Sequence, residues 1–127
     1  MSEVGRVMAT KTTETAQDGL AVLAGVIRLL DAAADRCLRL LAAGPPSRLE
    51  EAVALSDLGL AARLAGHHAR GLLPADVELG TSSLNQDDPV ELVRAAEALT
   101  RTAPLEALPE GSSYLVVALC DLLREHG

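Results

Sequence analysis

The longest stretch of patterned apolar residues runs from about Glu14 to Ala43. Apolar residues recur there at alternating steps of three and four, the spacing of one face of an α-helix. A first seam consists of Leu20, Leu23, Ile27, Leu30, Ala34, Cys37 and Leu41. A second seam consists of Val22, Val26, Leu29, Ala33 and Leu40. Only a narrow polar stripe remains: Arg28, Asp31, Asp35 and Arg39. The pattern predicts a long helix that other elements cover on most of its circumference.

A second helix is predicted directly after a short break. Residues 44–46, Gly-Pro-Pro, end the first helix, since neither residue type continues one. Residues 47–50, Ser-Arg-Leu-Glu, have the pattern of a capping box, so the second helix is expected to start at this serine. It is expected to end at Leu72 or Leu73, ahead of Pro74. Because the connection is short, the two helices are predicted to form an antiparallel hairpin.

This second helix is apolar on two opposite faces of different character. One face is bulky: Leu49, Val53, Leu60 and Leu64. The other is mostly small: Ala52, Leu55, Leu58, Gly59, Ala62, Ala65, Gly66 and Ala69. Small residues allow two backbones to approach closely. The interpretation is that the small face meets its own copy about a twofold axis, with the interface at Gly59, Ala62, Gly66 and Ala69.

The remainder of the chain predicts two shorter helices. Residues 74–87 form a polar loop, and Asp88-Pro89-Val90-Glu91 is a helix start that leads to about Thr100. The apolar residues of this helix are Leu92, Val93, Ala96 and Leu99, and Glu97 is placed to pair with Arg101. One further turn is expected at 104–108, and a last helix is expected from Ser112 or Ser113, with its apolar face at Leu115, Leu119 and Leu122. Residues 1–15, polar and aperiodic, are predicted to be a flexible arm, and residues 16–127 a single helical domain. The predicted fold class is all-α, a four-helix bundle-like arrangement of a long N-terminal hairpin and two shorter helices.

Composition supports the all-α prediction. The 127 residues include 24 Leu and 22 Ala, but one Ile, one Tyr and no Phe or Trp; Leu and Ala favour helices, whereas β-branched and aromatic residues favour strands. One Lys beside ten Arg is typical of a GC-rich bacterial genome. The formal net charge is −7, all of it from residues 71–127. An acidic chain without aromatic side chains on which bases could stack binds nucleic acid poorly, and its charge repels an anionic membrane. Neither partner is therefore expected.

No targeting segment is evident, and a cytoplasmic location is expected. The apolar run 20–27 stops at Arg28 and follows acidic residues, whereas a signal peptide carries a basic flank there. Cys37 and Cys120 both fall within apolar helical patterns, so each is interpreted as a small buried hydrophobe.

The adjacent histidines His67 and His68 are the most conspicuous candidates for chemistry. Neighbouring helical residues point about 100° apart and cannot ligate one ion, so no metal and no cofactor are expected. The favoured interpretation is structural, because His67, His68 and Arg70 lie near the C-terminus of the second helix, where positive charge opposes the helix dipole.

Arg63 and His68 have an Arg-x4-His spacing that resembles the motif of HEPN-type ribonucleases. The resemblance covers six residues and departs from the family at Leu64, where those enzymes usually carry a polar residue. It implies a catalytic pair in which Arg63 holds a phosphate and His68 moves a proton.

The function that the sequence favours is non-catalytic: a helical-bundle interaction protein, homodimeric and able to bind another protein. An alternative is a sensor or biosynthetic accessory protein that holds a small apolar ligand between helices, with His67, Leu60 and Leu64 as candidate lining residues. The HEPN-like ribonuclease with Arg63 and His68 is the third reading.

Overall fold

The structure is a computed structural model that describes the backbone of residues 2–43, 48–74 and 88–126. Side chains are described within these ranges from residue 19 onward, except at residue 105. The elements are α1 (Ser2–Ala42), α2 (Leu49–Leu72), α3 (Pro89–Thr100), the 3₁₀ turn η1 (Leu105–Ala107) and α4 (Ser112–His126). Every regular element of the described chain is helical, which confirms the predicted all-α bundle-like fold.

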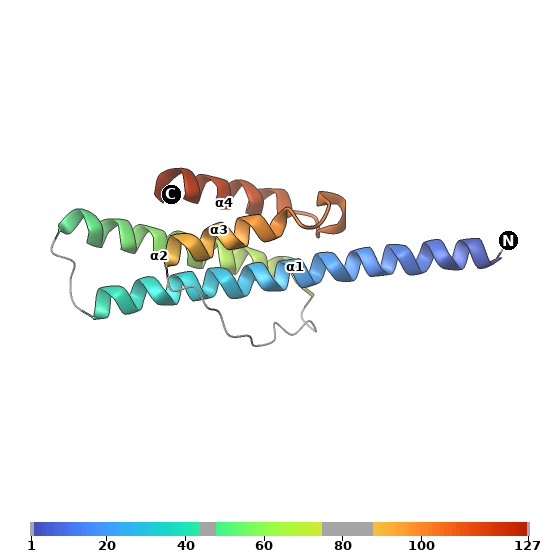
Figure 1. Cartoon of the computed structure of the whole chain (residues 1–127), viewed down its shortest axis with the longest axis horizontal. Coiled ribbons are helices and arrows are strands. Elements are labelled where there is room, and N and C mark those ends of the chain that lie inside the picture. Colours follow the sequence, from blue (N-terminus) through green and yellow to red (C-terminus); the bar gives the residue numbers. More distant parts are fainter. Residues whose placement is uncertain (1, 44–47, 75–87, 127) are drawn as a thin grey trace.

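The helix contacts place the four helices at the corners of a square. Neighbouring helices run antiparallel (Figure 1). α1 packs against α2 and α3, and α4 packs against the same two helices from the opposite side. α1 and α4 therefore lie on one diagonal of the square, and α2 and α3 on the other. The N-terminal turns of α1 extend past the ends of the other helices.

One apolar core lies between the helices. From the first seam of α1, Leu23, Ile27, Leu30, Ala34 and Cys37 are buried, each 1% exposed or less. The third helix contributes Leu92, Val93 and Ala96, and the fourth contributes Leu115, Leu119 and Leu122. These are the core faces that the apolar spacing predicts, so this part of the prediction is confirmed.

The helix ends agree with the sequence in some places and differ in others. Asp88 caps α3 as predicted: its Oδ1 accepts a hydrogen bond from the backbone N–H of Val90 at 3.0 Å. At α2 the N-cap residue is Arg48, whose side chain makes no capping hydrogen bond. The predicted cap, Ser47, lies outside the described residues, as does most of the predicted loop at 74–87.

The predicted start of the first helix is wrong. The sequence indicates a start near Glu14, whereas the backbone of α1 is helical from Ser2. Residues 1–15 lack an apolar period, which is why pattern analysis does not detect this part of the helix. The flexibility of an arm at residues 1–15 stays a prediction.

Candidate functional site

The small face of α2 lies inside the chain, against α1. Ala62 and Ala69 are fully buried, and Gly66 is buried as well. A Cβ placed on Gly59 would lie 3.0 Å from the Cβ of Cys37, and one placed on Gly66 would lie 3.3 Å from Oδ1 of Asp31. The predicted interface at Gly59, Ala62, Gly66 and Ala69 is therefore wrong, because α1 of the same chain already occupies this face.

The bulky face of α2 is exposed. Its members, here called the outer face of α2, are Leu49 (80% exposed), Val53 (50%), Leu60 (62%) and Leu64 (61%). On the adjacent α4, Tyr114 and Val117 are also exposed. Large apolar side chains grouped on one surface are typical of an interaction site, whereas single ones are ordinary.

Two apolar grooves flank this outer face. The groove between α1 and α2 has a volume of about 240 Å³, and its lining includes Leu38, Leu41 and Leu60. The groove between α2 and α4 has a volume of about 290 Å³, and its lining includes Leu64 and Tyr114. The middle of α2 is therefore a ridge of leucines between two hollows of similar size.

The two histidines of the doublet face different helices. Nε2 of His68 lies 3.5 Å from the carbonyl oxygen of Gly111, which precedes α4, and its ring centroid lies 6.3 Å from that of Tyr114. His67 instead lines a depression beside α1 that it shares with Asp31, Asp35, Arg63 and Arg70. Among the described residues, no group of three or more His, Cys, Asp or Glu side chains could hold a metal ion.

The structure does not bring the catalytic candidates together. Arg63 lines the depression on the α1 side of α2, whereas His68 lines the groove on the α4 side. A phosphate held by Arg63 would therefore lie across the helix from the imidazole of His68. The geometry within one chain does not support the ribonuclease reading.

The ligand-lining candidates are also separated. Leu60 lines the groove between α1 and α2, Leu64 lines the groove between α2 and α4, and His67 lines the polar depression. All three residues are exposed. They share one side of the helical wheel, but in the described part of the chain they line three different hollows.

An ion pair between helices was not predicted from the sequence. Nη2 of Arg70 on α2 donates to Oδ2 of Asp31 on α1. The sequence places Asp31 in the polar stripe of the first helix and Arg70 at the end of the second, but spacing alone does not pair residues on different helices. Arg70 therefore has an acidic partner within its own chain.

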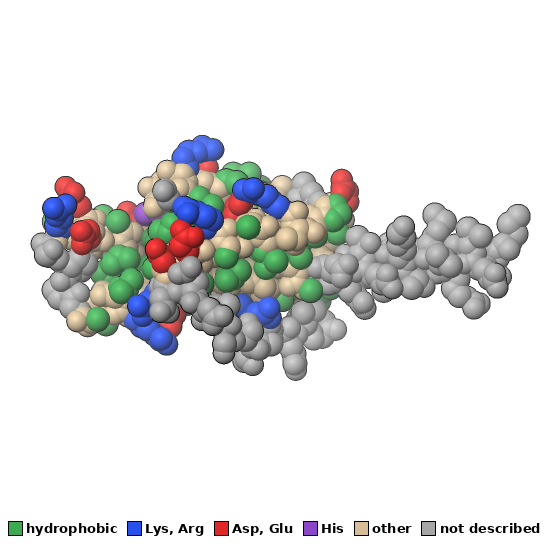
Figure 2. Space-filling view, viewed as in Figure 1, with side chains coloured by type: hydrophobic (Ala, Val, Ile, Leu, Met, Phe, Trp, Pro, Cys, Tyr) green, Lys and Arg blue, Asp and Glu red, His purple; other side chains and the backbone are tan. Residues whose placement is uncertain are grey.

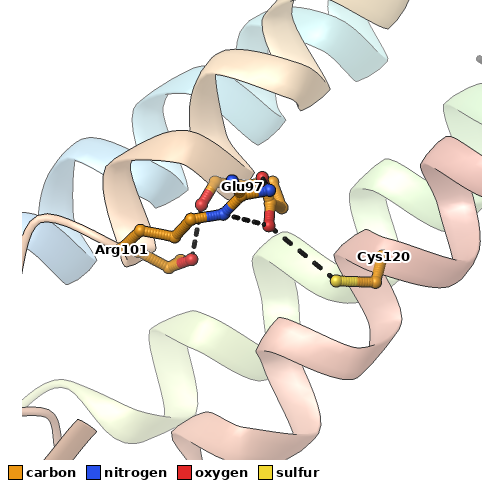
Figure 3. A network of polar contacts seen from close by, with 4 residues as sticks. Glu97, Arg101 and Cys120 are labelled. Atoms are coloured by element: carbon orange, nitrogen blue, oxygen red, sulfur yellow. Dashed lines mark hydrogen bonds and ion pairs between the residues drawn. The ribbon is translucent and has the colours of Figure 1, made fainter. Parts of the chain in front are cut away.

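A buried carboxylate lies between α3 and α4. Glu97 is 4% exposed, and Arg101 binds it through two hydrogen bonds, Nε to Oε1 at 2.8 Å and Nη2 to Oε2 at 2.6 Å (Figure 3). The thiol of Cys120 on α4 approaches from the other side, with Sγ 3.9 Å from Oε1 of Glu97. The predicted pairing of Glu97 with Arg101 is confirmed, and this carboxylate has its partners within the chain.

We expect Arg101→Ala to lower the free energy of unfolding by about 1–2 kcal/mol, because it leaves a buried carboxylate without its bidentate partner. The guanidinium is largely exposed, which keeps the loss below that of a fully buried pair. Urea denaturation would measure the change. Arg94→Ala is the matched control: it removes an exposed pair with Glu91 on the same helix and should cost no more than about 0.5 kcal/mol. Equal effects of the two variants would contradict the prediction.

The cysteines are free thiols on different helices, Cys37 buried and Cys120 partly buried. Burial raises the pKa of the Cys37 thiol above its ordinary value, so its nucleophilic thiolate form is disfavoured. Cys37 is therefore a core residue, as the sequence predicts.

No protein-family model, curated protein or solved structure matches this chain. No helix in the described part of the chain is both long enough and apolar enough to cross a lipid bilayer. On the face shown in Figure 2, charged side chains of both signs are interspersed, without a broad basic patch of the kind that binds nucleic acid.

Proposed function

We propose that the protein acts by binding rather than by catalysis, as a cytoplasmic helical-bundle interaction protein that forms a homodimer through the outer face of α2. The observation that carries the proposal is the exposure of Leu49, Val53, Leu60 and Leu64 on one side of a single helix. Burying a large aliphatic side chain stabilises an interface by about 1.5–3 kcal/mol. Four such side chains are enough to offset a substantial part of the entropic cost of association.

Binding of a small apolar ligand is the second candidate and fits the grooves less well. Ligand pockets usually enclose about 300–1,000 Å³. The two apolar grooves, at about 240 and 290 Å³, fall below this range and open at the surface. A second protein that packs over the two grooves would also shield their apolar lining from water.

We expect Leu60→Glu to convert the homodimer to a monomer, because the substitution places a charge in the middle of the apolar contact. Light scattering over a range of protein concentrations would measure the molecular mass. Circular dichroism should stay helical, since Leu60 is exposed in the single chain. Ala98→Glu is the control, since it adds the same charge at an exposed position of α3, the helix diagonally opposite α2.

Two results would contradict the proposal. One is a strictly monomeric wild-type protein at the highest concentration reached. The other is a Leu60→Glu variant that dimerises as well as Ala98→Glu does. Native mass spectrometry of the purified protein would identify a retained small molecule, the result that favours the second candidate.

A further inference from the structure

The apolar groove between α1 and α2 and the polar depression beside α1 share one residue, Arg63. Along α2, Arg63 is the last residue that lines the groove and the first that lines the depression. Both hollows also take their other wall from α1, which runs antiparallel to α2 (Figure 1). The two therefore follow one another along the same helix boundary. Together they are here called the α1–α2 hollow.

The two parts of the α1–α2 hollow differ in chemistry. Apart from Ser56 and Arg63, the groove is lined by apolar residues, among them Leu38, Leu41 and Leu55. The depression is lined by charged and imidazole side chains. The groove has a volume of about 240 Å³ and the depression about 400 Å³, so together they reach the range of about 300–1,000 Å³ usual for ligand pockets. A molecule that fills both parts needs an apolar tail and a polar head.

The charges of the depression determine the sign of that head. Each of its two carboxylates already has an arginine partner: Asp31 is paired with Arg70, and Oδ2 of Asp35 lies 3.0 Å from Nη2 of Arg39. Arg63, in contrast, forms no ion pair with any side chain that the structure describes. An anionic head would supply Arg63 with a partner. A cationic head would have to displace an arginine from an aspartate.

α2 presents the groups that such a molecule needs in the required order. Leu60 lines the apolar groove, Arg63 follows three residues later, and His67 lines the depression four residues beyond Arg63. Residues at this spacing lie on one face of a helix. A guanidinium donates two parallel hydrogen bonds to a carboxylate, and an imidazole N–H is a further donor. The side chains of Arg63 and His67 are both exposed, so a ligand can reach them from solvent.

We infer that the α1–α2 hollow binds an aliphatic carboxylate, with its hydrocarbon tail in the apolar groove and its carboxylate on Arg63. Burial of the tail supplies affinity, and the unpaired guanidinium selects the charge of the head. The inference goes beyond the proposed function, because one chain supplies every residue of the site. It therefore holds for a monomer as well as for a dimer.

NMR titration of isotope-labelled protein tests the inference, because it reports both the dissociation constant and the location of the ligand. Octanoate is the probe, and it is compared with octanol, octylamine and butyrate. Octanoate is expected to bind about tenfold or more tightly than octanol, the difference that one charged hydrogen bond of ordinary strength implies. Butyrate has the same head and a shorter tail, so it is expected to bind more weakly than octanoate.

Two variants separate the head from the tail. Arg63→Gln is expected to weaken octanoate binding about tenfold or more and to leave octanol binding unchanged, because it removes only the cation. Leu38→Asn is expected to weaken both ligands, because it acts on the wall of the groove. Leu38 is 56% exposed, so the fold should be retained, as circular dichroism would check. Arg124→Gln is the control, since it makes the same change in charge on α4, diagonally opposite α1, and should alter neither ligand.

Each contrary outcome identifies the part of the inference that is wrong. Octanol that binds as tightly as octanoate, or octanoate binding that survives Arg63→Gln, would show that Arg63 does not select the head. Tighter binding of octylamine would show that the aspartates set the charge of the ligand. Absence of saturable octanoate binding, or shifts confined to the groove between α2 and α4, would also overturn the site. A strictly monomeric protein that binds octanoate at Arg63 would overturn the proposed dimer and support this inference.

Discussion

Ala62→Leu is expected to destabilise the fold by about 3 kcal/mol. Ala62 lies in the middle of α2, is fully buried and belongs to the single apolar core. The face of α2 that carries Ala62 approaches α1 closely. The neighbouring positions on this face, one turn before and one turn after Ala62, are Gly59 and Gly66. Three additional carbon atoms at this position would force α1 and α2 apart or push side chains out of their rotamers, which typically costs about 1–3 kcal/mol. The tight packing of the hairpin places the expected loss at the upper end of that range.

Chemical denaturation of Ala62→Leu, monitored by circular dichroism, would measure the loss. Ala54→Leu is a matched control, because it makes the same substitution in the same helix at an exposed position. Its effect should stay within about 0.5 kcal/mol. If Ala62→Leu left the stability of the monomer unchanged and abolished dimerisation, the small face would be the subunit interface after all. The packing of α2 on α1 described above would then be wrong.

The contrast between the two faces of α2 shows how far the sequence leads. Periodicity identifies both apolar faces, and the small residues correctly indicate a close approach of two backbones. The sequence does not say which backbone approaches, since α1 of the same chain and a second subunit would leave the same pattern. Contacts such as that between Gly59 and Cys37 depend on the tertiary arrangement of the hairpin. The face that remains exposed is the bulky one, for which the sequence names no specific partner.

Local signals were more reliable than relationships between helices. The cap at Asp88 and the pair between Glu97 and Arg101 involve residues within four positions of each other, and both were predicted correctly. The divergence of His67 from His68 follows from helix geometry alone. The neighbours of His67 on α1, Asp31 and Asp35, are 36 and 32 residues away in the chain. Gly111, which His68 contacts ahead of α4, is 43 residues away. The spacing of residues along the sequence does not reveal such contacts. The prediction that His67, Leu60 and Leu64 line one ligand site therefore failed.

Gly19→Ala is expected to lower the stability of the fold by about 2 kcal/mol or more. Gly19 lies where α1 passes the segment that follows α3, and the contact is between backbones. A Cβ placed on Gly19 would lie 2.0 Å from the carbonyl oxygen of Ala107 and 2.8 Å from its carbonyl carbon. If the Cβ met a neighbouring side chain, that side chain could rotate away. The atoms that it meets belong to the backbone of η1, which can move only if the whole turn or α1 shifts. The clash therefore outweighs the gain of about 1 kcal/mol that alanine normally brings to a helix in place of glycine.

Gly71→Ala separates the clash from helix propensity. Gly71 is also helical, near the end of α2, and a Cβ placed there would meet no atom within 4 Å. This control should leave stability unchanged or raise it by up to about 1 kcal/mol. Urea denaturation would measure the free energy of unfolding of both variants. If α1 and η1 approach each other this closely, Gly19→Ala lowers this free energy, whereas Gly71→Ala leaves it unchanged or raises it. Equal stabilisation by the two substitutions would show instead that α1 does not pass η1 at this distance, and that the turn has room for a side chain at residue 19.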